Sequence, residues 1–219
     1  MARDQPVHSQ IYLIAEPGLD PGALRRALDA GGVACVLLRS ASVDDEALRA
    51  AIEALRPVAH EREVAFLIEN KARLAYETGC DGVHLSPGGM TVKQARQDLG
   101  AEAIVGVQCG ASRHAAIVAA EAGADYVAFG GGAAEDWWED PADPELLSWW
   151  QAIMTTPCVA IVGGDLQTAG EMAAVGADFV AVGSCIWSDP AGPDAAVRDL
   201  LALLGGGEDA SDASRGRAT

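Results

Sequence analysis

The sequence predicts a single (β/α)8 barrel, and three observations lead to that fold class. Eight short apolar runs alternate with amphipathic helical stretches along 219 residues, a length that suits one α/β domain. The runs are apolar throughout, as buried parallel strands are. A phrase also recurs every ~45–55 residues, about twice the length of one βα unit. Its copies are Gly79-Cys-Asp-Gly-Val, Gly123-Ala-Asp-Tyr-Val, Gly176-Ala-Asp-Phe-Val and a worn fourth, Gly32-Val-Ala-Cys-Val.

The first half of the chain is expected to supply four strands and four helices. Pro21 opens the first helix at a position where its missing N–H does no harm, and Gly31-Gly32 stop that helix. Thr91 is the expected cap of the fourth helix. The expected strands are Ile11–Ala15, Val33–Leu38, Val64–Ile68 and the run within Gly79–Leu85, and the expected helices are Pro21–Ala30, Asp44–Ala59, Ala72–Thr78 and Thr91–Leu99.

The second half repeats this alternation. Between residues 166 and 175 the apolar residues have helical spacing, and Gly176 stops the helix before the last strand. The expected strands are Ile104–Cys109, Tyr126–Phe129, Cys158–Val162 and Phe179–Val182, and the expected helices are Ser112–Ala122, Glu145–Met154, Leu166–Val175 and Asp194–Leu204. We therefore expect one domain over residues 1–204, followed by a disordered acidic tail over 205–219.

Composition narrows the possible partners. Half of the residues are hydrophobic, which is enough for a sizeable core, and the formal net charge of −17 argues against nucleic acid and anionic membranes. No run approaches the ~20 apolar residues of a membrane helix, and the N-terminus has no signal-peptide core, so a cytoplasmic protein is expected. The cysteines at 35, 80, 109, 158 and 185 form no C-x-x-C and are interpreted as reduced thiols. Oligomeric state stays open, with a homodimer as one possibility.

Two of the apolar runs end in small residues that suit a phosphate site. Gly163-Gly164 follows the seventh strand, and Gly183-Ser184 follows the eighth. Backbone N–H groups of glycine can approach a ligand closely, and the loops after strands 7 and 8 are the usual phosphate site of such barrels. We expect a phosphorylated small molecule to bind there, with plain turns as the alternative reading.

At its strand ends the chain resembles the thiamine phosphate synthase/TenI family over nearly all of residues 11–204. The resemblance rests on the order and spacing of short signatures. They are Tyr12-Leu-Ile14, Leu38-Arg39, Gly82-Val-His-Leu85, Ile104-Val-Gly106, Gly123-Ala-Asp-Tyr126, Ala160-Ile161 with Gly163-Gly164, and Gly176-Ala-Asp178 with Ala181-Val-Gly-Ser184. It implies an enzyme of thiamine biosynthesis that joins an aminopyrimidine methyl diphosphate to a thiazole phosphate with Mg2+ and releases pyrophosphate. One branch of the family isomerises the thiazole phosphate instead.

The positions that the resemblance assigns to the metal differ from the family pattern. The family has Asn-Asp-Arg after the third strand, where this chain has Glu69, Asn70 and Lys71. A second metal-binding Asp of the family falls at Gly89. Glu69 and Asn70 are the oxygen donors that remain for Mg2+, and Asn70 is neutral and therefore weaker. We expect a metal site with too few good oxygen donors for Mg2+, and thiamine phosphate synthesis that is weak or absent.

Other family positions have changed as well. The synthases usually have Gln-Leu-Arg-x-Lys after the second strand, and Leu37-Leu38-Arg39-Ser40-Ala41 keeps only the Leu and the Arg. The Thr and Lys expected after the sixth strand fall in Glu135-Asp136-Trp137-Trp138. Gly131 stands where the isomerising branch has a His.

Each candidate residue also has a structural interpretation. Arg39, Lys71 and Glu69 are the candidate catalytic residues, and a salt bridge to a neighbouring loop is the alternative for both cations. His84 lies inside a strand phrase, which favours a buried barrel histidine over a catalyst. Trp149-Trp150 on a helix are expected in a core or an interface, and Trp137-Trp138 could cover the barrel mouth or stack on a ligand ring.

Two function classes follow. The first is an enzyme of thiamine phosphate assembly with an altered site. The second is a non-catalytic or differently catalytic relative that binds another phosphorylated small molecule through the same glycine loops. A third, weaker alternative is a phosphate-binding barrel of amino-acid biosynthesis, whose usual catalytic Lys and Glu on early strands are not evident.

Overall fold

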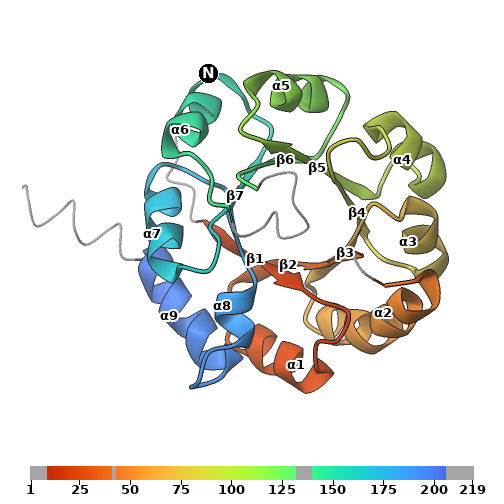
Figure 1. Cartoon of the computed structure of the whole chain (residues 1–219), viewed down its shortest axis with the longest axis vertical. Helices are drawn as coiled ribbons and strands as arrows, with labels where there is room; N and C mark the ends of the chain where they lie inside the picture. Colours follow the sequence, from red (N-terminus) through yellow and green to blue (C-terminus); the bar gives the residue numbers. More distant parts are fainter. Residues whose placement is uncertain (1–8, 41–42, 132–139, 206–219) are drawn as a thin grey trace, which may run out of the picture.

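The computed structural model describes residues 9–40, 43–131 and 140–205. Its centre is a closed barrel of eight parallel strands that follow one another in chain order. The barrel closes where β8 pairs with β1, with Gln10 opposite Phe179 and Leu13 opposite Val182. Figure 1 looks along the barrel and shows the helices arranged around the strands. The (β/α)8 barrel predicted from the sequence is confirmed.

The elements occupy nearly the ranges that the sequence predicts. The strands are β1 (Gln10–Ala15), β2 (Val33–Leu38), β3 (Ala65–Glu69), β4 (Gly82–Leu85), β5 (Ile104–Gly110), β6 (Tyr126–Phe129), β7 (Cys158–Ile161) and β8 (Phe179–Val182). The helices are α1 (Pro21–Asp29), α2 (Asp45–His60), α3 (Ala72–Thr78), α4 (Val92–Leu99), α5 (Arg113–Glu121), α6 (Pro144–Ile153), α7 (Leu166–Ala174), α8 (Ser184–Trp187) and α9 (Pro193–Gly205).

The short helix α8 is an addition to the predicted elements. Its four residues, Ser-Cys-Ile-Trp, form a single turn directly after β8. One turn is too short to show helical periodicity, so no pattern in the sequence predicts this helix. The predicted cap Thr91 is confirmed, because its hydroxyl accepts from the Gln94 backbone and completes a capping box. Helix α9 includes Gly205, and the tail from 206 onward lies outside the described residues.

The repeated phrase has a structural cause in its aspartates. In each full copy the carboxylate accepts a hydrogen bond from the backbone N–H at or next to the start of the preceding strand. Asp81 accepts from Phe66 at 2.7 Å, Asp125 from Val105 at 2.7 Å and Asp178 from Cys158 at 2.8 Å. Each of these aspartates therefore ties neighbouring strands together at the amino end of the barrel.

The glycine that opens each phrase ends the preceding helix. Gly79 has a φ of 69° and Gly176 a φ of 98°, in the left-handed region that residues with a Cβ avoid. The worn copy keeps this glycine but has Ala34 where the other copies have Asp. Each full copy of the repeat thus ends one helix with a glycine and then links two neighbouring strands through its aspartate.

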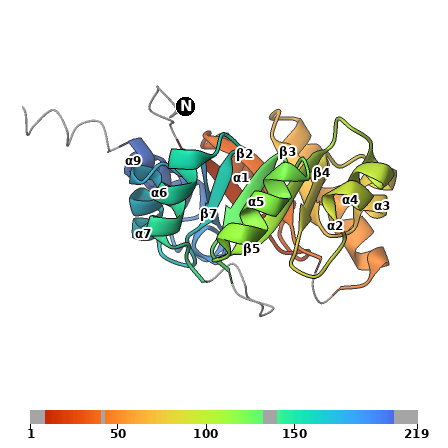
Figure 2. The same ribbon diagram turned by 90° about the horizontal axis from the view of Figure 1, so that it is seen from above.

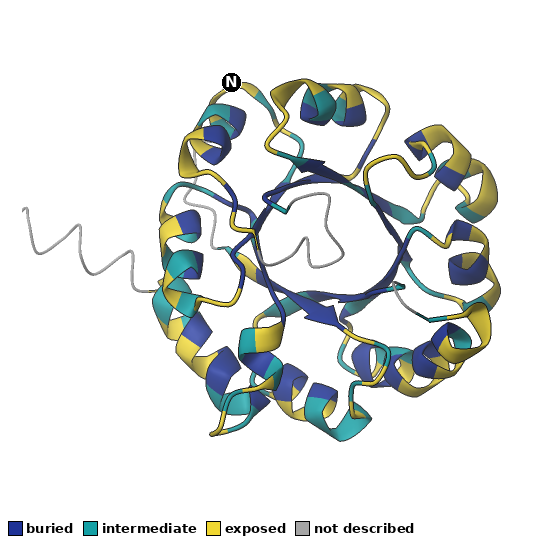
Figure 3. Cartoon of the chain, in the orientation of Figure 1, coloured by how far each residue is buried: buried dark blue, intermediate teal, exposed yellow. Residues whose placement is uncertain are grey.

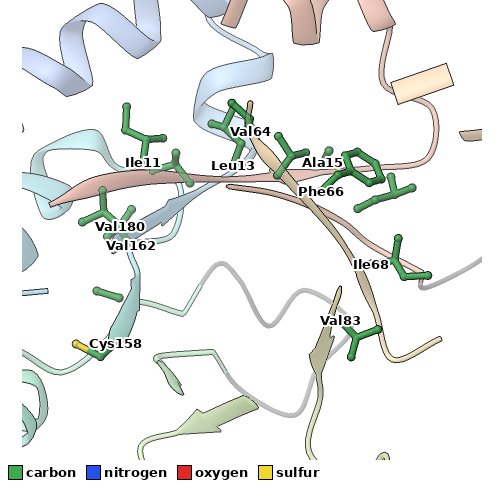
Figure 4. Close-up of a cluster of buried hydrophobic side chains, with 14 of the residues drawn as sticks. Ile11, Leu13, Ala15, Val64, Phe66, Ile68, Val83, Cys158, Val162 and Val180 are labelled. Carbon is green, nitrogen blue, oxygen red and sulfur yellow. The ribbon is translucent and has the colours of Figure 1, made fainter. Parts of the chain in front are cut away.

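The core has two layers, separated by the barrel wall. Outward residues of the strands pack against the helices, as Ile11, Leu13 and Ala15 of β1 do in Figure 4. Inward residues such as Tyr12 and Leu67 fill the barrel interior. Figure 3 shows the strands buried and the exposed residues on the outer helix surfaces, and Figure 2 shows the same helices from the side. Truncating an outer-layer side chain such as Phe66 to Ala should cost about 3–5 kcal/mol.

Within the described ranges, no helix has the length and apolar character needed to cross a membrane. The five cysteines are all free thiols, as the sequence predicts. Burial raises the pKa of the Cys35 thiol above its usual range and that of Cys158 to about 11, so both stay protonated at neutral pH.

Candidate active site

The candidate site lies at the carboxyl-terminal end of the strands, where barrels of this class carry their ligands. On one side of the barrel the strand ends carry polar and charged side chains, among them Arg39 after β2 and Glu69 of β3. On the other side, Gly163 lies two residues after the end of β7, and Gly183 follows β8 directly. One half of the barrel mouth is therefore lined by charged side chains, and in the other half glycines leave the backbone uncovered by side chains.

Arg39 and Glu69 form the centre of the charged half. Arg39 is 4 % exposed and Glu69 is 5 % exposed. The Arg39 Nε lies 3.9 Å from Glu69 Oε2, and Arg39 Nη1 donates to Glu16 Oε1 at 3.1 Å. Because a buried charge is costly without a partner, the two side chains depend on each other. The structure thus brings together two of the three predicted catalytic residues.

Both oxygens of the Glu69 carboxylate accept hydrogen bonds. Ser86 Oγ donates to Oε1 at 2.7 Å, and the backbone N–H of Ser40 donates to Oε2 at 3.2 Å. These contacts link the ends of β2, β3 and β4 through one side chain. Ser86 was not among the candidates from the sequence, although its position two residues after His84 places it on the same inward side of β4.

Asn70 supports the turn between β3 and α3 and faces the β4–α4 loop. Its φ of 60° is left-handed, a conformation that Asn tolerates better than most residues. Its side-chain oxygen accepts from the Ser86 backbone N–H at 2.8 Å. A Cβ placed on Gly89 would lie 3.1 Å from that same oxygen, so the two family metal positions do meet in space.

The donor set at this point does not fit a Mg2+ held by two carboxylates. The two positions that meet supply one amide oxygen and no side chain. The neighbouring carboxylate of Glu69 already accepts hydrogen bonds at both of its oxygens. Among the described residues, no group of three or more His, Cys, Asp or Glu side chains is arranged to hold a metal. The metal site expected at Glu69 and Asn70 stays a prediction.

Lys71 lies apart from the Arg39–Glu69 pair. Its Nζ is 3.0 Å from Asp45 Oδ1 at the start of α2, and its side chain is 44 % exposed. It lines a groove of about 500 Å3, together with residues of α2, α3 and the β4–α4 loop. The alternative reading of Lys71, a salt bridge to a neighbouring element, describes its contact in this structure. Its catalytic role stays a prediction.

The two glycine loops adjoin each other on the opposite side of the mouth. A Cβ on Gly164 would lie 3.9 Å from Ser184 Oγ, so the ends of β7 and β8 face a common space. Gly163 has a φ of 68°, which turns the chain sharply after β7. Trp187 at the end of α8 donates from Nε1 to the Ile14 carbonyl at 2.7 Å, which fixes α8 against β1. The two loops therefore lie side by side, and the phosphate cradle at Gly163, Gly164, Gly183 and Ser184 stays a prediction.

Beneath the site lies a group of buried polar residues that no motif in the sequence connects. Tyr12 and Tyr126 have their hydroxyls 2.8 Å apart, and the Tyr126 hydroxyl lies 2.9 Å from His84 Nδ1. Burial lowers the pKa of His84 to about 4, while Glu69 and the Gln108 carboxamide act in the opposite direction. The imidazole is therefore neutral at neutral pH. Polar residues at inward positions of otherwise apolar strands are the signal that could have identified this group.

Trp150 lies in the core, and its neighbour Trp149 is partly exposed. Trp150 is fully buried against Phe129, with ring centroids 5.4 Å apart, and donates from Nε1 to the Thr156 carbonyl. Trp149 is half-buried, with the Arg113 guanidinium 4.7 Å from its ring centroid. The expectation of a core position is therefore confirmed for Trp150. Trp137-Trp138 lie outside the described residues.

Comparison with known proteins places the chain in a family. The family model described as thiamine monophosphate synthase matches residues 11–186. A protein of Rhodospirillum centenum named thiamine-phosphate synthase is 48% identical over 205 residues, which cover 90% of this chain and 98% of that protein. A protein of the same name from Hyphomonas neptunium is 42% identical, with 90% and 94% covered. The chain belongs to the thiamine monophosphate synthase family.

Solved structures agree on the fold of this family member. A thiamine phosphate pyrophosphorylase from Pyrococcus furiosus superposes with a TM-score of 0.77 at 23% identity, covering 91% of this chain and 96% of the other. The 3-hexulose-6-phosphate synthase of Salmonella typhimurium gives a TM-score of 0.67 at 18% identity, with 90% and 99% covered. At these identities the likeness shows the barrel alone. The resemblance found in the sequence is confirmed at the level of the family.

Proposed function

We propose that the protein binds a phosphorylated small molecule of the thiazole phosphate type and couples it to an aminopyrimidine methyl diphosphate, as the names of its relatives suggest. The observation that carries this proposal is the meeting of the β7 and β8 glycine loops opposite a buried Arg39–Glu69 pair. Because the chain carries a net charge of −17, the phosphate would rest on backbone N–H groups of Gly163-Gly164 and Gly183-Ser184.

The charged half of the mouth suits the other substrate. In the coupling, the bond between the pyrimidine methylene carbon and the diphosphate oxygen breaks, and the thiazole nitrogen forms a new bond to that carbon. Negative charge then builds on the departing pyrophosphate. Arg39 supplies a permanent positive charge at this end of the barrel, and Glu69 with Ser86 fixes its direction. No step of this proposal passes through a metal ion, since the donors do not fit one.

The glycine loops offer a direct test. Gly164 has no positive φ, and a Cβ there meets nothing closer than Ser184 Oγ at 3.9 Å. Gly164→Ala should therefore fold normally while placing a methyl group in the cradle. We expect the affinity for thiazole phosphate, measured by calorimetry, to fall at least ~10-fold, the equivalent of about 1.4 kcal/mol.

Gly170→Ala is the matched control for that experiment. Gly170 lies within α7, and its added Cβ would make an ordinary contact of 3.7 Å with Leu203. This control should bind thiazole phosphate as the unmodified protein does. Equal affinities for both variants would show that the ligand does not rest on Gly164, and the assignment of the cradle would then be wrong.

A second candidate function is favoured by Asn70 and Gly89. With these residues the chain lacks the paired carboxylates that the resemblance assigns to the metal, which suits a non-catalytic or differently catalytic relative that only shares the phosphate cradle. Product formation from the two phosphorylated precursors, with and without Mg2+, separates the two candidates. We expect weak turnover with little Mg2+ stimulation. Binding of thiazole phosphate without any turnover would favour the second candidate, and robust Mg2+-dependent turnover would contradict the expected metal site.

A further inference from the structure

A cavity of about 180 Å3 lies inside the barrel at the amino-terminal ends of the strands, at the opposite end from the candidate active site. The first residues of four strands form its rim: Gln10 of β1, Ala65 of β3, Ile104 of β5 and Phe179 of β8. Each rim residue is at least partly exposed, so a small molecule can reach the cavity from solvent. The deeper wall is buried and includes Tyr12, Leu67 and Val159.

Small residues on neighbouring strands leave this space open. The interior of such a barrel is normally filled by layers of bulky side chains. Here the inward positions at the start of β2, β3 and β4 are held by Cys35, Ala65 and Gly82, and Ala65 pairs directly with Cys35. Gly82 has no room for a side chain, because an added Cβ would lie 1.8 Å from the Ile104 carbonyl oxygen. The layer at this end of the barrel is therefore incomplete on one side.

The worn copy of the repeated phrase contributes to the same space. Val33 pairs with Ile11, whereas Cys35 pairs with Tyr12, so Ala34 is an extra residue in β2. Ala34 stands where the full copies have the aspartate that ties two strands. Without that carboxylate, Ala34 and Cys35 both lie in the cavity wall. The departure from the repeat thus coincides with the cavity.

The wall of the cavity offers little to a polar ligand. The hydroxyls of Tyr12 and Tyr126 hydrogen-bond to each other, with their oxygens 2.8 Å apart. The buried Cys35 thiol behaves as a small hydrophobic group. The amide of Gln10 lies at the exposed rim, where water can satisfy it. A buried water needs two to four polar partners, so a cavity with this lining favours an apolar occupant.

We propose that this cavity is a binding site for one small neutral aromatic molecule, of the size of a single benzene ring. An apolar cavity of about 150 Å3 is enough to hold benzene, so this one is large enough for one ring. Aromatic side chains prefer edge-to-face contacts, and Tyr12, Tyr126 and Phe179 all line the cavity. A charged ligand is excluded, because it would lose its hydration without gaining a partner. The site uses no residue of the proposed phosphate cradle.

Benzene tests the site in the full-length protein, without any phosphorylated ligand. Benzene should raise the melting temperature in a concentration-dependent way, because it binds the folded state alone. Benzoate at the same concentration should not, because it carries a charge. In NMR spectra, benzene should shift the methyl signals of Ala65 and Ile104. Neither effect depends on the proposed function, so the failure of one proposal does not decide the other.

Two substitutions change the size of the cavity in opposite directions. Ala65→Leu fills the space, so benzene affinity should fall at least ~10-fold. Ala152→Leu makes the same change at an exposed position of α6 and is the matched control, with affinity unchanged. Ile104→Val removes one methylene from the wall, so the affinity for toluene relative to benzene should rise several-fold. This second variant keeps the test valid if Ala65→Leu does not fold.

Three results would overturn the proposal. Equal benzene affinity in Ala65→Leu and Ala152→Leu would place the ligand elsewhere on the protein. An unchanged preference between toluene and benzene in Ile104→Val would show that this wall does not contact the ring. The absence of any benzene effect on the unmodified protein would show that water or another part of the chain fills the cavity.

Discussion

The neutral state of His84 makes a quantitative prediction about stability and pH. The imidazole is 1 % exposed, and burial lowers its pKa from the usual 6.5 to about 4. Below pH 6.5 the unfolded chain binds a proton at this residue that the folded protein refuses, so stability falls as the pH falls from 6.5 toward 4. Above pH 6.5 both states are neutral at His84, and its contribution no longer changes.

The size of the effect follows from the two pKa values. With 6.5 in the unfolded chain and about 4 in the folded protein, the loss at pH 5.0 relative to pH 7.5 is about 2 kcal/mol. At pH 5.0 most unperturbed carboxylates are still ionised, so His84 dominates the comparison of variants. His84→Asn removes the titrating group, and its side-chain amide can both donate to and accept from the Tyr126 hydroxyl.

The assay is urea unfolding of both proteins at pH 7.5 and 5.0. The unmodified protein should lose about 2 kcal/mol more than His84→Asn between the two values. Every residue other than 84 is the same in both proteins, so the comparison isolates the contribution of His84. If the two proteins lost equal stability, burial would not hold the His84 imidazole neutral.

Three further predictions concern the site and the fold. Glu16→Gln should tighten the binding of thiazole phosphate or pyrophosphate several-fold in calorimetry, because it removes a negative charge 3.1 Å from Arg39. Unchanged affinity would show that Arg39 does not face the ligand. The double variant Asn70→Asp with Gly89→Asp should gain thermal stability from Mg2+, and any residual turnover with Mg2+ should rise. A melting temperature that Mg2+ does not change would contradict the pairing of these two positions. Asp178→Ala should cost about 1.5–3 kcal/mol in urea unfolding, since the Cys158 N–H and the Gln151 amide lose a charged acceptor, with ligand affinity unchanged.

The barrel could be predicted because its signals are local and repeated. Each apolar run is bounded by a glycine stop or a charged residue, and the repeated phrase carries both a helix stop and an aspartate that ties two strands. The glycine loops after β7 and β8 were predictable for the same reason, since their position follows from counting strands. Helix α8 was not, because a single turn has no period to detect.

Side-chain direction at the site was harder to predict than residue identity. Glu69 points inward as the last residue of β3, but Asn70 at a φ of 60° turns the chain, so the alternation of inward and outward residues ends there. Lys71 therefore reaches Asp45 at the start of α2 instead of the barrel interior. The sequence shows three adjacent polar residues, and only the backbone conformation of the middle one decides which of them share a site.

Under the proposed function, the contacts of Arg39 would let an acidic protein present a cation to a phosphorylated ligand. Arg39 contacts two carboxylates with different roles. Glu69 is buried and fixed by Ser86, whereas the Glu16 side chain is 51% exposed and contributes a contact that water or an anion can replace at little cost. In the proposed function, an arriving phosphate group would therefore take the place of Glu16 on Arg39 while Glu69 holds the guanidinium in position. Selectivity would then come from this exchange and from the bare backbone opposite it, with no need for a basic surface.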